Sequence, residues 1–479
     1  MTRKHLTLLG PVLGLFALCS ELQAGNFADV YGAHPYAAGM GNAVSSFIND
    51  SSATYYNPAG LGLPSRGDGL YYYMENGAGH PEMGDGESHT DGMFSNLWGR
   101  FNNEIIDGSL TNVPYKRPKE HRHEVSFQYN YAKPALHTTA PNNSDIADIN
   151  DHYFGLGMTL DLNSVYELDR GFRFGLNLIM PGSGNLTTVN DLNPTVHRYL
   201  QRGVSNDRPL IFGGLGFEIW KDHLYFGLGF TALFKGQGAI LLKDVPISPD
   251  PVTPNQQVIL ELKPQANETM GLMFHWGKFR LGASFRRETF MFVDPLTARA
   301  QTTLLGIQFD FDLAVLDLYH PRTFTYGLGF QATKNLMLSV DVSRELWSKY
   351  GLSRTKEKYY TQYYLNDISV PKVGVEYRWN EAWSFRLGYM RRPTPLPDDL
   401  PEEVNWMDSD QVSYTAGVSY AFIPDGASNL KSPIQIDLSL ESQQLKARTE
   451  LKVHPTDKNP IYDYGGSAFH AGLAISIFL

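Results

Sequence analysis

Apolar and polar residues alternate along most of the chain from about residue 123 to residue 479, and this period of two constrains the fold most strongly. In the stretch 124–131 every odd-numbered residue is apolar or aromatic and every even-numbered residue is polar. The same alternation recurs at 279–286 and 434–441. Successive side chains of a strand point to opposite faces, so each stretch predicts a strand with one apolar and one polar face.

Further alternating stretches bring the expected total to about 14–16 strands. They lie near 152–162, 170–180, 209–219, 223–235, 321–332, 335–347, 369–379, 382–392, 412–422 and 469–479. The last one reaches the end of the chain, with Phe478 penultimate and Leu479 last. Outer-membrane barrels commonly end on such a strand, whose terminal aromatic is recognised by the barrel-assembly machinery.

The apolar faces could contact either a protein core or lipid. A soluble sandwich rarely needs so many strands in one run, and no linker interrupts the chain after residue 123. The polar faces also carry many charges: Arg280, Arg286, Asp341, Glu345, Glu376, Arg378, Arg386, Asp437 and Glu441. A transmembrane barrel turns its apolar faces to lipid and its polar faces to the lumen, and closure pairs every backbone group. We therefore expect an all-β fold, a transmembrane antiparallel β-barrel.

Composition agrees with a barrel and excludes other classes. Aromatic residues make up 13% of the chain, yet the mean hydropathy is only −0.28. Past residue 20 no apolar run approaches the roughly 18 residues that a spanning helix needs, which excludes a polytopic helical membrane protein. The net charge of −10 argues against nucleic acid as a partner, because phosphate binding requires clustered Lys and Arg.

Residues 1–24 have the order of a secretory signal peptide: a basic start, a short apolar core and a small residue, Ala24, before the expected cleavage site. The single cysteine, Cys19, lies within this segment, so the mature protein would contain no disulfide or thiol nucleophile. Export of a barrel of this kind predicts the outer membrane of a Gram-negative bacterium as its location.

Residues 25–66 do not alternate and form a separate N-terminal segment, ahead of a barrel that we place at 67–479 with a first strand at 69–74. Small residues together with Phe47, Tyr55 and Tyr56 favour a packed plug in the lumen over a periplasmic tail. The insertion 75–122 has no clear assignment.

The motif Ala53-Thr54-Tyr55-Tyr56-Asn57-Pro58-Ala59-Gly60-Leu61, preceded by Gly39-Met40-Gly41-Asn42-Ala43, resembles the N-terminal hatch of FadL-type outer-membrane transporters. Further similarity lies at 321–329, 338–350 and 373–389. This resemblance implies a monomeric barrel of 14 strands, plugged by the hatch, that takes up long-chain fatty acids or other hydrocarbons. In that family the substrate is captured among extracellular loops, passes a pocket beside the hatch and leaves sideways into the membrane.

The resemblance places the substrate pocket at hatch residues Phe47, Tyr55, Tyr56, Asn57, Pro58, Ala59 and Gly60. Three lumen arginines could bind a carboxylate head group or could instead join a lumen salt-bridge network: Arg280, Arg286 and Arg386. We expect no catalytic residues, because no Ser–His or Asp–His spacing stands out. We also expect no cofactor and no metal, since the scattered histidines His80, His89, His121 and His123 are typical of solvated loops.

The expected partners are a hydrophobic small molecule, outer-membrane lipid and lipopolysaccharide, and the barrel-assembly machinery. Two other functions remain open: an anchor or docking barrel for secreted proteins, and a general porin. Two long loops could capture substrate. In 181–208, Val196, Tyr199 and Leu200 could share one face of a short helix. The second loop, 301–320, is more apolar than an exposed loop should be, and its part 301–316 could instead be another lipid-facing strand.

Overall fold

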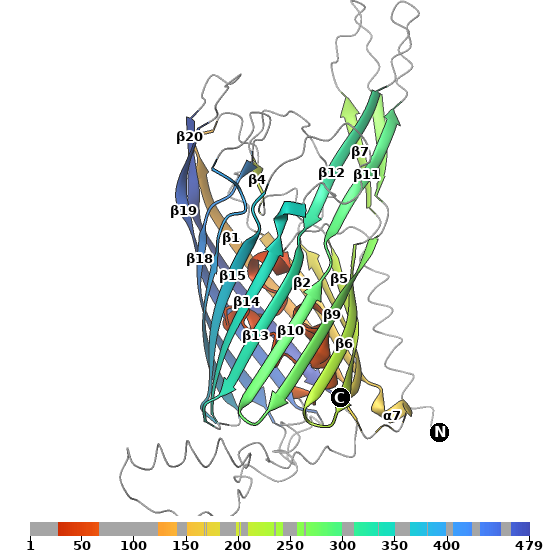
Figure 1. The fold of residues 1–479 in the computed structure, drawn as a ribbon, viewed down its shortest axis with the longest axis vertical. Coiled ribbons are helices and arrows are strands. Elements are labelled where there is room, and N and C mark those ends of the chain that lie inside the picture. The colour runs from red at the N-terminus through yellow and green to blue at the C-terminus, as the bar shows by residue number, and fades with distance from the viewer. Residues whose placement is uncertain are drawn as a thin grey trace, which may run out of the picture.

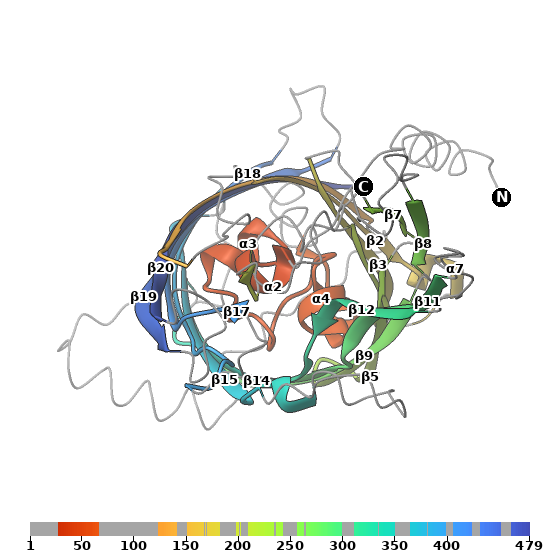
Figure 2. The same ribbon diagram turned by 90° about the horizontal axis from the view of Figure 1, so that it is seen from above.

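The computed structural model shows a closed barrel with a helical segment inside it (Figures 1 and 2). It describes residues 27–66, 123–140, 151–166, 170–182, 198–200, 209–233, 236–242, 256–262, 265–298, 311–333, 335–349, 365–380, 382–398, 406–423, 432–451 and 461–479, and in addition 168 and 202. The expected signal peptide 1–24, first strand 69–74 and insertion 75–122 lie outside these residues.

Fourteen antiparallel strands form the barrel, which confirms the predicted fold class and strand number. In barrel order they are β1 (Glu124–Thr138), β2 (Asp151–Asp161), β3 (Phe172–Pro181), β5 (Leu210–Trp220), β6 (Leu224–Leu233), β9 (Gln265–Trp276), β10 (Phe279–Arg286), β13 (Arg322–Gln331), β14 (Leu336–Leu346), β15 (Ile368–Arg378), β16 (Trp383–Arg392), β18 (Gln411–Phe422), β19 (Ile434–Leu451) and β20 (Ile461–Phe478). The ring closes where β1 pairs with β20, from Glu124 opposite Phe478 to Thr138 opposite Tyr464.

The two ends of the barrel differ. Short turns join β5 to β6, β9 to β10 and β13 to β14 at the end that also holds the C-terminus, which we call the turn end (Figure 1). Longer connections leave the opposite loop end. Two of them contain hairpins that rise beyond the barrel, β7 (Gly236–Leu242) with β8 (Gln256–Leu262) and β11 (Thr289–Ala298) with β12 (Phe311–His320).

The remaining short elements lie at the two rims. The helix α7 (Asn163–Tyr166) follows β2, and the 3-10 helix η3 (Trp347–Lys349) follows β14. Two loop-end connections meet in a small parallel sheet of β4 (Arg198–Tyr199) and β17 (Trp406–Met407).

The outer surface of the barrel is apolar, as the alternation predicts. Phe127, Leu328 and Leu387 are 47%, 44% and 64% exposed, whereas their inward-facing neighbours Ser126, Gly327 and Arg386 are buried. Trp220, Trp276 and Trp379 are exposed near the turns, at the level where aromatic side chains meet the membrane surface. The outside is therefore the surface of a membrane-spanning barrel.

Two loop predictions need correction. Residues 311–320 form β12, which pairs with β11 outside the barrel, so 311–316 is not another lipid-facing barrel strand; 301–310 lies outside the described residues. The predicted helix is wrong at Tyr199, which lies in the strand β4. The backbone of Met407 accepts a hydrogen bond from Leu200, and this pairing between two loops replaces the helical bond.

Inside the ring lie three short helices and one 3-10 helix from the N-terminal segment (Figure 2): α2 (Phe27–Tyr31), α3 (Pro35–Gly39), α4 (Ala53–Tyr56) and η1 (Pro58–Gly62). We call residues 27–66 the hatch. Nearly all of its residues are buried, and its apolar side chains form one cluster with inward-facing residues of the barrel.

The hatch backbone packs directly against inward-facing glycines of the barrel wall. A Cβ atom on Gly282 would lie 2.7 Å from the carbonyl carbon of Ser45, closer than real Cβ contacts allow, and one on Gly227 would overlap Pro58 and Ala59. The tripeptide Gly-Leu-Gly recurs in the barrel strands at 155–157, 214–216, 227–229 and 327–329. At each of the four sites the leucine is on the lipid side and at least one glycine leaves room for the hatch.

We predict that Gly282→Val weakens hatch docking by about 1–3 kcal/mol, the usual cost of overpacking. The measurement is ion conductance of the purified protein in planar bilayers, which should rise. Ala283→Val adds comparable bulk on the opposite, outward face of β10 and should leave conductance unchanged. Heat-dependent gel mobility should show that both variants are correctly assembled. Equal conductance of the two assembled variants would contradict the close contact between the hatch backbone and Gly282.

Candidate functional site

Asn57 fixes the centre of the hatch to the barrel wall. Its side-chain Nδ2 donates to the carbonyl oxygen of Ser45 at 2.8 Å within the hatch and to those of Leu272 and Ala283, on β9 and β10, at 3.2 and 3.4 Å. Its Oδ1 accepts a hydrogen bond of 3.1 Å from the Ala59 amide and so caps η1. One buried amide side chain thus connects two parts of the hatch with two neighbouring strands.

The segment after Asn57 gives η1 its shape. Pro58 occupies the first position of this 3-10 helix, where its missing N–H costs no hydrogen bond. Ala59 is buried, and a Cβ on Gly60 would overlap the carbonyl group of Ile48. These three predicted site residues therefore form a tightly packed part of the hatch, the 3-10 helix η1.

Two of the predicted aromatic residues of the hatch, Tyr55 and Tyr56, lie together on a different side. Tyr56 donates from its hydroxyl to Asn42 Oδ1 at 2.6 Å, and the ring of Tyr55 lies edge-on to Tyr56 at 4.8 Å between centroids. Tyr55 also meets Phe212 of β5 edge-on at 5.1 Å. Phe47 is buried in the same apolar cluster.

Apolar side chains on one sector of the barrel wall continue this aromatic surface. Tyr153, Ile179, Leu210 and Phe212 project inward from the loop-end halves of β2, β3 and β5 and are at most 4% exposed. Phe27 of the hatch packs on Tyr153, with 4.1 Å between ring centroids. We call these four wall residues the apolar sector. It faces the hatch on the side of the long loops.

Asp29 of α2 links the hatch to the loop end of the wall. Its Oδ1 accepts a hydrogen bond of 2.7 Å from Arg286 Nη2 and a short one from the Tyr55 hydroxyl, while its Oδ2 lies 2.7 Å from His320 Nδ1. Arg286 also lies over the Tyr55 ring, 4.6 Å from its centroid. Burial alone would raise the pKa of Asp29, but the charge of Arg286 and the hydrogen bond from His320 hold it well below its usual range.

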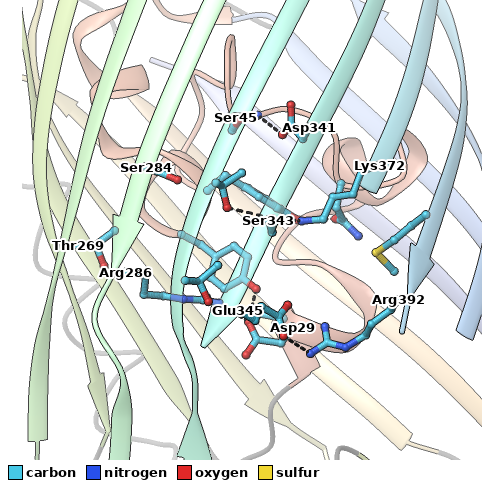
Figure 3. A pocket seen from close by; sticks show the side chains of 17 residues that line it. Asp29, Ser45, Thr269, Ser284, Arg286, Asp341, Ser343, Glu345, Lys372 and Arg392 are labelled. Atoms are coloured by element: carbon cyan, nitrogen blue, oxygen red, sulfur yellow. Dashed lines mark hydrogen bonds and ion pairs between the residues drawn. The ribbon is translucent and has the colours of Figure 1, made fainter. Parts of the chain in front are cut away.

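A cavity of about 50 Å³ lies between the hatch and the wall next to Asp29 (Figure 3). Its lining is polar and includes three cationic and three anionic side chains: Arg286, Lys372 and Arg392, and Asp29, Asp341 and Glu345. Arg392 Nη2 lies 2.7 Å from Glu345 Oε2, and Lys372 is directly opposite Asp341 in the β14–β15 ladder. The cavity is therefore balanced in charge and polar, unlike the apolar sector.

Arg386 lies in an ion-pair network below the hatch, toward the turn end. Its Nη2 is 3.0 Å from Asp437 Oδ1 and its Nε is 3.3 Å from Glu376 Oε2. Arg66 of the hatch pairs with Asp437 as well, and both arginines lie over the Tyr36 ring. In this arrangement the charge of Arg386 is already compensated.

Arg280 donates a long hydrogen bond, 3.5 Å, to Gln331 Oε1, and it does not line the cavity. The structure thus separates the three arginines that the sequence groups as possible head-group contacts. Arg286 is at the loop side of the hatch, Arg386 is at the turn side, and Arg280 is on the wall near the start of β10.

Three residues that connect the hatch to the wall were not predicted from the sequence: Asp29, His320 and Arg173. Arg173 of β3 donates to the carbonyl oxygens of Leu61 and Asn49, both at 2.9 Å. Asp29 could have been noticed as one of the few charged residues in the hatch. Nothing in the pattern of the sequence pairs it with Arg286, which is 257 positions away.

Among the described residues no cluster of three or more possible metal ligands occurs. The ring of His123 accepts a hydrogen bond of 3.1 Å from the Asp161 amide, whereas His80, His89 and His121 lie outside the part of the chain that the structure describes. Within the described ranges, no helix is long and apolar enough to cross a membrane.

Comparisons with known proteins agree with this architecture. No family model matches the chain. Alkane uptake protein A of Marinobacter nauticus is 31% identical over 83 residues, which cover 17% of this chain and 18% of that protein, so the match spans less than a fifth of the relative. The crystal structure of a Pseudomonas aeruginosa FadL homologue superposes with a TM-score of 0.52 at 14% identity, covering 96% of this chain and 99% of the other.

The P. putida toluene transporter TodX gives a TM-score of 0.45 at 14% identity, covering 93% of this chain and 98% of the other. The similarity to the FadL homologue shows that this chain shares its barrel fold.

Hatch docking should depend on pH through His34, the N-cap of α3. Its Nδ1 accepts a hydrogen bond of 3.1 Å from the Tyr36 amide. Burial, together with the charge of Arg66, lowers the pKa of His34 to about 3, although Asp437 opposes the shift. An undocked His34 takes up a proton below about pH 6.5 and a docked one does not. The free energy that favours hatch docking should therefore decrease as the pH falls below about 6.5, by up to about 1.4 kcal/mol per pH unit.

The measurement is the frequency of open events in planar bilayers between pH 7.5 and pH 4.5. His34→Asn keeps an acceptor for the Tyr36 amide but cannot be protonated, so its frequency should rise less than that of the wild type. Parallel pH dependences of the two proteins would show that His34 does not carry the effect.

Proposed function

The chain has the FadL-type barrel fold, and we propose that it carries hydrophobic molecules passively across the bacterial outer membrane. The observation that carries this proposal is the apolar sector beside Tyr55, a continuous set of apolar and aromatic wall residues that the docked hatch keeps dry. The partial similarity to an alkane uptake protein supports the same substrate class.

We propose that the solute enters from the loop end, taken as the extracellular side. Longer connections at that end are typical of the outer face of such barrels. The apolar sector lies on the loop-end halves of its strands, so a solute from that side would reach it once the hatch shifts. Each methylene buried there is stabilised by roughly 0.8 kcal/mol, so a long hydrocarbon needs no polar anchor.

We propose that release is sideways into the membrane. Beyond the hatch, the lumen toward the turn end holds the paired charges of Arg66, Arg386 and Asp437. An apolar solute passing there would separate these charges from polar partners without replacing the lost interactions, which is unfavourable. The lipid outside offers a better environment than this polar region does. A small shift of the hatch upon binding would open the path, and such a shift needs only differential affinity and no energy source.

The other readings have less support. A general porin needs an open water-filled lumen, whereas here the hatch packs against the wall all around the ring. A docking barrel for secreted proteins would need no apolar surface inside the lumen.

We further propose that the chain acts as a monomer, is delivered by a signal peptide cleaved after Ala24, and is assembled through its C-terminal strand.

Proteoliposomes should take up a labelled long-chain hydrocarbon through the intact protein without leaking small sugars. A protein lacking residues 25–62 should leak sugars quickly, because the plug would be gone. Absence of hydrocarbon uptake by the intact protein would contradict the transport proposal, and rapid sugar leakage through it would favour a porin.

Asn57→Ala should weaken hydrocarbon uptake while the barrel still assembles. The change removes the three donor contacts of Asn57, and each buried carbonyl group left without its donor costs about 1–3 kcal/mol. Asn49→Ala is the matched control, since the Asn49 side chain donates to Pro64 within the hatch. Uptake unchanged in Asn57→Ala would count against a role of the hatch in transport.

A further inference from the structure

Asp29 places a carboxylate of the hatch among three donors, and we propose that this residue determines specificity. It fills the position that a substrate carboxylate would take, so the protein carries neutral hydrocarbons in preference to fatty-acid anions. This inference rests on the proposed transport function.

The donors around Asp29 make a complete carboxylate site. A guanidinium from β10, an imidazole from β12 and a phenol from the hatch converge on its two oxygens. The side chains of Arg286, His320 and Asp29 are 16%, 7% and 7% exposed, so the bonds form away from bulk water. Charge-assisted bonds of this kind are stronger than neutral ones. A free fatty acid would have to displace the resident carboxylate to use the same donors.

The resident carboxylate is also ionised. The charge of Arg286 and the hydrogen bonds to Asp29 outweigh its burial and keep its pKa well below the usual range. Asp29 therefore carries a full negative charge at neutral pH. That charge repels a second carboxylate as well as occupying its place.

The other two cations that line the cavity lie beside carboxylates of the same lining. Arg392 is paired with Glu345, and Lys372 faces Asp341 across the ladder and donates to Ser343 Oγ at 3.1 Å (Figure 3). The cavity is therefore neutral as a whole. A carboxylate that entered it would be an uncompensated charge in a confined space, which is strongly unfavourable.

Tyr55 connects this cluster to the substrate surface. Its hydroxyl donates to Asp29 while its ring touches Phe212 of the apolar sector. A chain bound along the apolar sector would thus end beside Arg286 and Asp29. This is where the head group of a fatty acid would have to be accommodated, and it is where Asp29 stands.

The test compares uptake of hexadecane and of palmitate into proteoliposomes at neutral pH. The wild type should favour hexadecane. Asp29→Ala should raise the palmitate-to-hexadecane ratio about tenfold, the effect of making one buried charge-assisted bond available to the substrate. Asp29→Glu keeps the carboxylate and should keep the wild-type preference. Arg286→Gln combined with Asp29→Ala should abolish the gain.

The inference would be overturned if the wild type took up palmitate and hexadecane equally well, or if the palmitate-to-hexadecane ratio were unchanged in Asp29→Ala. Either result would leave the transport proposal intact. Should neither probe enter, the transport proposal fails, and palmitate binding to the detergent-solubilised proteins decides the question. Binding should be about tenfold tighter in Asp29→Ala than in the wild type, and equal affinities would overturn the inference. If Asp29→Ala does not assemble, Asp29→Asn removes the charge at nearly constant volume and serves in the same comparison.

Discussion

The structure depends on the direct contact between the hatch backbone and the glycine-lined inner face of the barrel. At Gly227, Gly271 and Gly282 there is no room for a side chain, because hatch backbone or the Asn57 side chain occupies the space. A barrel of this size would otherwise enclose water. The hatch fills it, and the glycines set how close it comes. Every other contact follows from this position, including the reach of Asn57 to β9 and β10 and that of Asp29 to Arg286.

The docked hatch divides the lumen into regions of different chemistry. The apolar sector lies on β2, β3 and β5, the polar cavity lies against β9 to β16, and paired charges lie toward the turn end. Buried charges are costly unless they are paired, and three of the lumen carboxylates, Asp29, Glu345 and Asp437, have arginine partners. The proposed function requires such a division, because apolar molecules would approach the hatch while polar solutes and ions would meet a closed interior.

The sequence predicts the barrel strands closely and the hatch contacts poorly. Alternation locates strands because one face must be apolar against lipid, and 279–286 coincides with β10. It misses β9, where Met273 points inward and Glu268 lies on the outward-facing side near the loop end, so both break the pattern. The resemblance to a known hatch motif identifies Asn57, but only the fold shows which carbonyl groups Asn57 reaches.

The head-group arginines illustrate the same limit. Arg280, Arg286 and Arg386 look alike in the sequence, since each is a cation on the polar face of a strand. Two of the partners come from far away along the chain: Asp29, 257 positions away, neutralises Arg286, and Asp437, 51 positions away, neutralises Arg386. Glu376, by contrast, faces Arg386 across the adjacent strands β15 and β16. Pairing across such separations is a property of the closed fold, and no local pattern encodes it.

The proposed function requires that an apolar solute binds inside the lumen at the apolar sector, beside the docked hatch. A crystal structure of the protein soaked with a brominated long-chain alkane tests it most directly, because bromine is located by its anomalous signal. The account predicts a bromine peak next to Phe212 and Tyr55. A peak confined to the polar cavity between Lys372 and Arg392, or bromine only on the outer lipid-facing surface, would contradict it.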